Sequence, residues 1–176
     1  MSGSDLQAFV LDELRIVQDK ISSDDVDSWR GFFDDKEIPY EEERCRDHLI
    51  GLLRQGSDMI YYEPEAHVAD DKRVDIACTV ENLQLPIEIK GQWHDELWIA
   101  ADNQLAKHYT VDWQAENRGI YLVLWFGDQP KNKALKSPGR GQKHPETASE
   151  LCEMLKVRSQ AVSDGRVIIV VFDLER

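Results

Sequence analysis

The order of apolar and polar residues along the chain predicts helices that give way to strands near residue 59. Before that point apolar residues recur every three or four positions, and after it short runs alternate or stay apolar. The predicted helices cover residues 5–21, 40–55, 95–109 and 146–160, and the predicted strands cover residues 59–68, 73–80, 85–90, 119–126 and 166–173. Gly56 is the expected cap of the second helix. This order predicts a mixed central sheet flanked by helices.

The composition is that of an ordinary globular protein with one core. The 176 residues, of which 41% are hydrophobic and 31% charged, suit a single domain. The longest apolar runs are too short to cross a bilayer, and the first residues lack the basic and apolar parts of a signal peptide. Cys45, Cys78 and Cys152 are far apart, which favours small core residues in a reducing compartment. We therefore expect a cytoplasmic protein without membrane association.

The net charge of -13 argues against a passive nucleic-acid-binding module, because such modules present basic surfaces. An enzyme that holds phosphate through a divalent cation tolerates this acidity better. Residues 131–143 differ from the rest, since they contain five lysines and arginines and no acidic residue. This loop is either a solvated stretch or the best candidate for contact with a DNA backbone.

The residues that best indicate chemistry lie on two consecutive predicted strands. Because side chains alternate along a strand, Glu88 and Lys90 share one face while Ile87 and Ile89 face the opposite layer. Asp75, on the preceding strand, can stand beside Glu88. Burying such polar groups is costly without a task, and carboxylate oxygens suit Mg²⁺ or Mn²⁺. The alternative is a buried ion pair between Glu88 and Lys90 with a structural Asp75.

These residues and the elements around them resemble the PD-(D/E)XK nuclease superfamily. The likeness rests on V-D-I at 74–76, I-E-I-K at 87–90 and the α-β-β-β-α-β order over residues 41–126. It implies a restriction-endonuclease-like core and a single nuclease domain, 1–176. The expected layout is a helical extension (1–39), a catalytic core (40–126), and a basic loop, helix and final strand (127–176).

The resemblance also implies further site residues around an Mg²⁺ ion, for which Mn²⁺ could substitute. A helix carboxylate is expected from Glu41, Glu42 or Glu43, and the helical wheel favours Glu42 among the three. A solvated acidic first turn, stabilised by the helix dipole, stays open as the alternative. The metal ligands would be Asp75, Glu88, Glu42 and the backbone carbonyl of Ile89. Gln104, on the helix after the lysine strand, is either a site residue or simply exposed.

One position departs from the pattern of the superfamily, and the histidines do not indicate a metal site of another kind. In one branch of the superfamily a tyrosine follows the glutamine by four residues, but His108 stands there and Tyr109 comes one later. His67, His94 and His144 show no ligand spacing, so a zinc site is not expected.

The expected function is hydrolysis of DNA phosphodiester bonds by a metal-dependent endonuclease. The blocks I-E-I-K-G-Q-W at 87–93, E-L-W at 96–98, Q-L at 104–105 and G-I-Y-L-V at 119–123 are similar to nuclease-like domains at the C-terminal ends of large bacterial proteins, including antiviral-defence effectors. This likeness implies a role in antiviral defence and a larger sensor or ATPase protein, or further domains, as partner. A catalytically silent module that binds nucleic acid or a protein, a nuclease acting on RNA, and a homo-oligomer stay open as alternatives.

Overall fold

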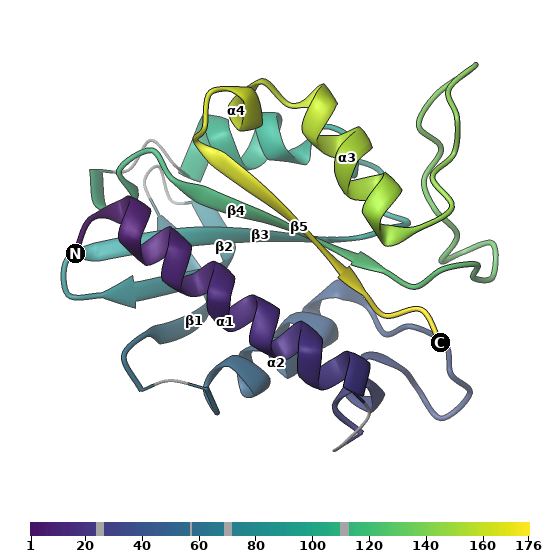
Figure 1. Cartoon of the computed structure of the whole chain (residues 1–176), viewed down its shortest axis with the longest axis horizontal. Coiled ribbons are helices and arrows are strands. Elements are labelled where there is room, and N and C mark those ends of the chain that lie inside the picture. The colour runs from purple at the N-terminus through teal and green to yellow at the C-terminus, as the bar shows by residue number, and fades with distance from the viewer. Residues whose placement is uncertain (24–26, 57, 69–71, 110–112) are drawn as a thin grey trace.

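The protein forms a mixed five-stranded sheet covered by helices on both faces. A computed structural model describes residues 1–23, 27–56, 58–68, 72–109 and 113–176. The strands follow the order of the chain: β1 (Tyr61–Val68), β2 (Lys72–Val80), β3 (Leu83–Gly91), β4 (Gly119–Trp125) and β5 (Val167–Asp173). The first three are antiparallel, while β3, β4 and β5 are parallel. The predicted mixed α/β architecture is confirmed (Figure 1).

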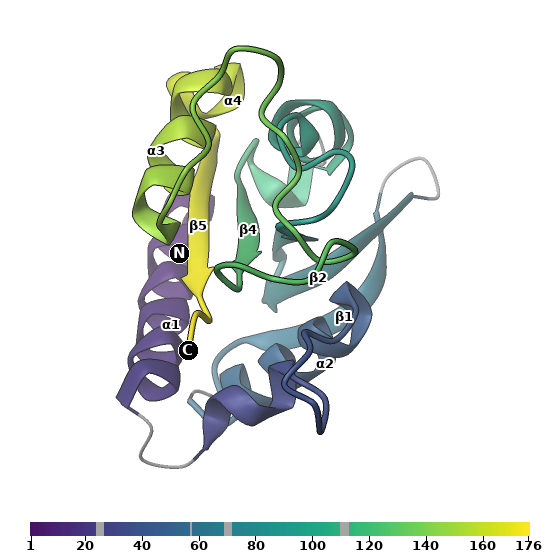
Figure 2. The same ribbon diagram turned by 90° about the vertical axis from the view of Figure 1, so that its right-hand side faces the viewer.

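The helices divide between the two faces of the sheet (Figure 2). One layer contains α1 (Gly3–Ser23), η1 (Ser28–Phe32) and α2 (Glu42–Leu53), and the other contains η3 (Ala101–Tyr109), α3 (Ala148–Arg158) and α4 (Gln160–Ser163). A short 3₁₀ helix, η4 (Trp113–Ala115), precedes β4. The alternation of side chains along β3 and β4 separates the two cores. Ile87 and Ile89 pack in the α1 and α2 layer, whereas Tyr121 and Val123 pack in the layer of η3 and α3.

Three of the predicted helices end or are interrupted differently in the structure. The second helix ends at Leu53 with Arg54 in right-handed conformation, and Gly56 has no positive φ, so the expected glycine cap is wrong. The helix predicted over 95–109 is a π-helix confined to its second half. The last predicted helix is interrupted at Ser159, whose backbone is extended. The Ser159 hydroxyl accepts the Val162 amide and thereby caps the start of α4. Side-chain hydrogen bonding by Ser competes with helix continuation in this way.

Two simpler predictions concern the cysteines and the helices as a whole. Cys45 and Cys78 are buried free thiols and Cys152 is half-buried, as expected of small core residues. Among the described helices, none combines the length and the apolar character that a bilayer span requires.

Candidate functional site

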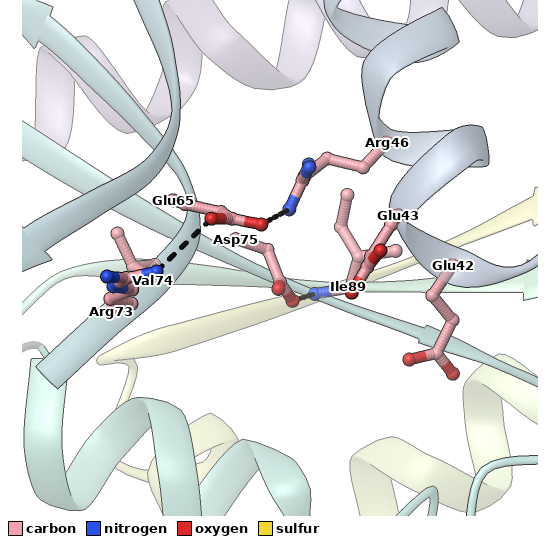
Figure 3. Close-up of a pocket in the computed structure, with 8 residues that line it drawn as sticks. All are labelled: Glu42, Glu43, Arg46, Glu65, Arg73, Val74, Asp75 and Ile89. Atoms are coloured by element: carbon pink, nitrogen blue, oxygen red, sulfur yellow. Dashed lines mark hydrogen bonds and ion pairs between the residues drawn. The ribbon is translucent and has the colours of Figure 1, made fainter.

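The candidate site lies where β2 separates from β3. Pairing between these strands ends at Ile76 and Ile87, so the last residues of β3 keep only β4 as a partner strand. Two carboxylates take the place of the missing strand. Asp75 Oδ2 accepts the Ile89 amide at 2.7 Å, as Figure 3 shows, and Glu42 Oε1 accepts the Gly91 amide at 2.7 Å. We call this region the fork: it consists of Asp75 of β2, Glu42 of α2 and the last residues of β3, from Glu88 to Gly91.

Glu88 and Lys90 complete the fork from the face of β3 that packs against η3. Their cross-strand partners are Tyr121 and Val123, which belong to the core on that side. Glu88 is 3% exposed and Lys90 is 7% exposed, and Lys90 Nζ donates to Glu88 Oε1 at 2.6 Å. The shared face that alternation predicted is present, and so is the buried ion pair of the alternative interpretation.

Burial leaves the three carboxylates of the fork with pKa values above their ordinary ranges. Burial, together with the negative charge of Asp75, raises the pKa of Glu88 to about 7. Burial also raises the pKa of Asp75 and of Glu42, against the opposite effect of the strand amides that they accept. Burial alone would lower the pKa of Lys90, but the three carboxylates together hold it above its ordinary value. One charged ammonium therefore faces three carboxylates, and negative charge is in excess.

The fork could hold a divalent cation, although its side chains have other partners here. Among the described residues, no three His, Cys, Asp or Glu side chains stand ready as a metal-binding group. Lys90 engages Glu88, and strand amides engage one oxygen each of Asp75 and Glu42. The donor set nevertheless suits Mg²⁺ or Mn²⁺, which prefer carboxylate and carbonyl oxygens. The Ile89 carbonyl adds to it, because the N–H and C=O of one strand residue point to the same side.

A cavity of about 270 Å³ opens beside Asp75, between α2, β1 and β2 (Figure 3). Arg46 reaches across it to Glu65, with Nη1 at 3.1 Å from Oε1, and Arg73 pairs with the other oxygen of Glu65. Glu65 has a φ of 49°, a strained conformation for a residue that is not glycine. It lies where pairing between β1 and β2 is interrupted, next to Asp75 in register. This cavity exposes Asp75 and Glu42 rather than the buried Glu88 and Lys90.

His94 is a residue of the site that the sequence argument set aside. Its Nε2 lies 4.0 Å from Glu42 Oε2, and its side chain is 29% exposed. Burial lowers the pKa of His94, and the positive charge of Lys90 lowers it further. The available signal was its place four residues after Lys90, in the loop that leaves β3; ligand spacing could not reveal it.

Gln104 contacts Glu96 instead of the fork. Its Nε2 donates to the Glu96 carboxylate, and its Oε1 is buried without a hydrogen-bond partner in the part of the chain that the structure describes. The side chains of His108 and Tyr109, considered for the tyrosine position, lie outside the described residues. Gln104 thus joins η3 to the loop that carries His94.

Gln92 fastens the basic loop to the end of β3. The side chain is fully buried, donates to the carbonyls of Gly127 and Lys133 at 2.9 and 3.0 Å, and accepts the Phe126 amide at 2.7 Å. The basic loop therefore lies next to the fork. Burial raises the pKa of Glu42, and the positive charge of Lys133 offsets part of that rise.

Most lysines and arginines of this loop have partners within the protein, so few of them are available for the expected contact with a DNA backbone. Lys133 is buried, with Nζ 3.9 Å from the Trp93 ring centroid. The ion pairs of the loop are Lys133–Glu41, Lys136–Asp95 and Lys143–Glu150. Lys131 and Arg140 are exposed and form no ion pair within the described ranges. Phosphate contact from this loop would fall to these two side chains.

The comparison with protein families places the site inside a matched region. The chain belongs to DUF8371, a domain of unknown function, whose family model matches residues 6–128. The matched span contains Glu42, Asp75, Glu88, Lys90 and His94. Neither a curated protein nor a solved structure matches the chain.

Proposed function

We propose that this protein is a metal-dependent nuclease of the PD-(D/E)XK kind that hydrolyses phosphodiester bonds in DNA. The observation that carries the proposal is the fork itself, where Asp75, Glu88 and Glu42 converge with the buried Lys90 at the open edge of β3. A purely structural ion pair would require neither the extra carboxylates nor the excess negative charge, both of which cost stability when buried.

The arrangement of elements supports the same proposal. The order α2-β1-β2-β3-η3-β4 agrees with the α-β-β-β-α-β order of a restriction-endonuclease-like core. The antiparallel strands β1, β2 and β3 are followed by β4, which runs parallel to β3 after a helical crossover. The acidic residue of the core helix, Glu42, meets the end of the strand that carries Glu88 and Lys90.

In the proposed mechanism Asp75, Glu88, Glu42 and the Ile89 carbonyl would hold Mg²⁺. A bound ion supplies positive charge to the phosphate and lowers the pKa of water. The role of Lys90 follows from its own electrostatics. Because the carboxylates raise its pKa, Lys90 is charged at neutral pH in the metal-free protein, and its ammonium would orient water or stabilise charge on the phosphate.

Plasmid cleavage tests the proposed function directly. We expect supercoiled plasmid to be nicked and linearised in the presence of Mg²⁺ or Mn²⁺, and to stay intact in EDTA. The metal contacts phosphate rather than sugar, so the site itself does not distinguish RNA from DNA. A parallel reaction with labelled single-stranded RNA tests the alternative that RNA is the substrate. A protein that binds plasmid yet cuts neither nucleic acid with either ion is instead a silent module.

Replacing Lys90 with Met should separate catalysis from metal binding. Methionine keeps the apolar stem but removes the ammonium, so we expect cleavage to fall by about 10²-fold or more. Calorimetric titration should show Mn²⁺ affinity equal to or tighter than that of the wild type, because the carboxylates lose their nearby cation. Lys107→Met, at an exposed position of η3, is the matched control. Loss of Mn²⁺ binding in Lys90→Met would show that this division of roles is wrong.

A further inference from the structure

His94 lies beside the fork, with one ring nitrogen directed toward Glu42. It lies in the loop that follows β3, whose last residue is Gly91, and its Nε2 is 4.0 Å from Glu42 Oε2. The charges of Asp75 and Lys90 both act on this ring. The side chain is therefore part of the fork's rim, partly open to solvent.

The hydrogen bonds of the ring determine which nitrogen bears the proton. Nδ1 accepts the backbone amide of Glu96 at 3.0 Å. A nitrogen that accepts an N–H has its lone pair in use, so the proton of the neutral ring is on Nε2. The Glu96 carboxylate is itself held by Gln104, which tethers this loop to η3.

This tautomer makes His94 a hydrogen-bond donor toward the fork and unsuited to bind a metal. A metal-ligating histidine turns a bare nitrogen to the ion and donates the N–H of the other nitrogen to a nearby acceptor. In His94 the bare nitrogen is used by the protein, and the protonated one faces the fork. Glu42 is too distant to accept it, and Nε2 forms no hydrogen bond within the described part of the chain.

We propose that His94 is a substrate-contacting residue whose Nε2–H donates to a non-bridging oxygen of the phosphodiester that is cleaved. The inference rests on the proposed nuclease function and adds a specific donor to it. The carboxylates of the fork can only accept hydrogen bonds when ionised, and the charged Lys90 shares its donors with Glu88. A phosphate oxygen at the fork would thus find its uncommitted neutral donor in His94.

The test uses His94→Ala and His94→Gln with a synthetic DNA duplex that carries one phosphorothioate of known configuration at the cleaved bond. Alanine removes the donor, so the single-turnover rate should fall by about 10²-fold. Glutamine places an amide donor near the position of Nε2 and should recover most of that loss. In the wild type one diastereomer should be cleaved slowly with Mg²⁺ and not be rescued by Mn²⁺, and this sulfur effect should vanish in His94→Ala. His144→Ala, at an exposed loop position, is the control.

Calorimetric titration with Mn²⁺ provides the readout independent of activity, and His94→Ala should bind the ion as the wild type does. A loss of Mn²⁺ affinity in both variants would make His94 a ligand and overturn the donor role. An active wild type with unchanged rates and sulfur effects in His94→Ala would overturn the inference alone. A wild type that cleaves no phosphodiester would overturn the proposed function itself, and this inference with it.

Discussion

Asp75→Asn should abolish metal-dependent cleavage while leaving the fold intact. Asparagine retains an oxygen that can accept the Ile89 amide, so the separation of β2 from β3 keeps its hydrogen bond. The substitution removes one negative charge from the proposed cation site, and we expect the cleavage rate to fall by about 10²-fold or more. Plasmid cleavage with Mg²⁺ measures the rate, and a thermal melt without metal measures stability. Stability should equal or exceed that of the wild type, because burial makes the Asp75 charge unfavourable.

The control for this variant is Asp128→Asn, at an exposed turn after β4. It makes the same chemical change at an exposed carboxylate that is not among the proposed metal ligands, and should cleave as the wild type does. Normal cleavage by Asp75→Asn with normal metal dependence would remove Asp75 from the active centre. A variant that no longer folds would instead show that Asp75 is needed to cap the open edge of β3.

The strands and the shared face of Glu88 and Lys90 were predictable because they depend on local periodicity. Side chains alternate strictly along a strand, so residues two positions apart, such as Glu88 and Lys90, point to the same side. The helical wheel similarly predicted that Glu42 lies on the apolar face of its helix, and this carboxylate accepts the Gly91 amide. Each of these predictions needed only neighbouring residues and the period of one element.

The other features depend on how distant segments meet, which periodicity does not specify. The early end of β2–β3 pairing gives Asp75 a backbone partner, Ile89, that no pattern indicated. The partner of Gln104 is likewise determined by a loop, and so is the ring orientation of His94. The basic loop looked available from its composition, yet Lys133 is buried against Trp93. Hydrogen bonds and ion pairs between separate elements decide these positions.

Glu88→Gln should stabilise the metal-free protein at pH 8 and lose this advantage as the pH falls toward 5. The folded-state pKa of Glu88 is raised from 4.5 to about 7 by burial and by Asp75. Above the folded pKa the group is charged in both states, and the folded state bears the full cost of the buried charge. Below the unfolded pKa it is protonated in both states, and the cost disappears. The stability gain of the variant at pH 8 is at most roughly 3 kcal/mol.

The informative quantity is the difference between wild type and Glu88→Gln, measured by denaturant unfolding in EDTA from pH 5 to 8. Burial lowers the folded-state pKa of His94, so this residue affects the pH dependence of stability with the opposite sign. Because His94 is present in both proteins, its contribution largely cancels in the difference. A difference that does not change with pH would mean that Glu88 is not held with a raised pKa. Saturating Mn²⁺ should then narrow the difference at pH 8, because an ion at 100 times its Kd adds about 2.7 kcal/mol to the stability of a protein that binds it. The variant lacks one proposed ligand and should gain less; equal stabilisation of both proteins would remove Glu88 from the set of metal ligands.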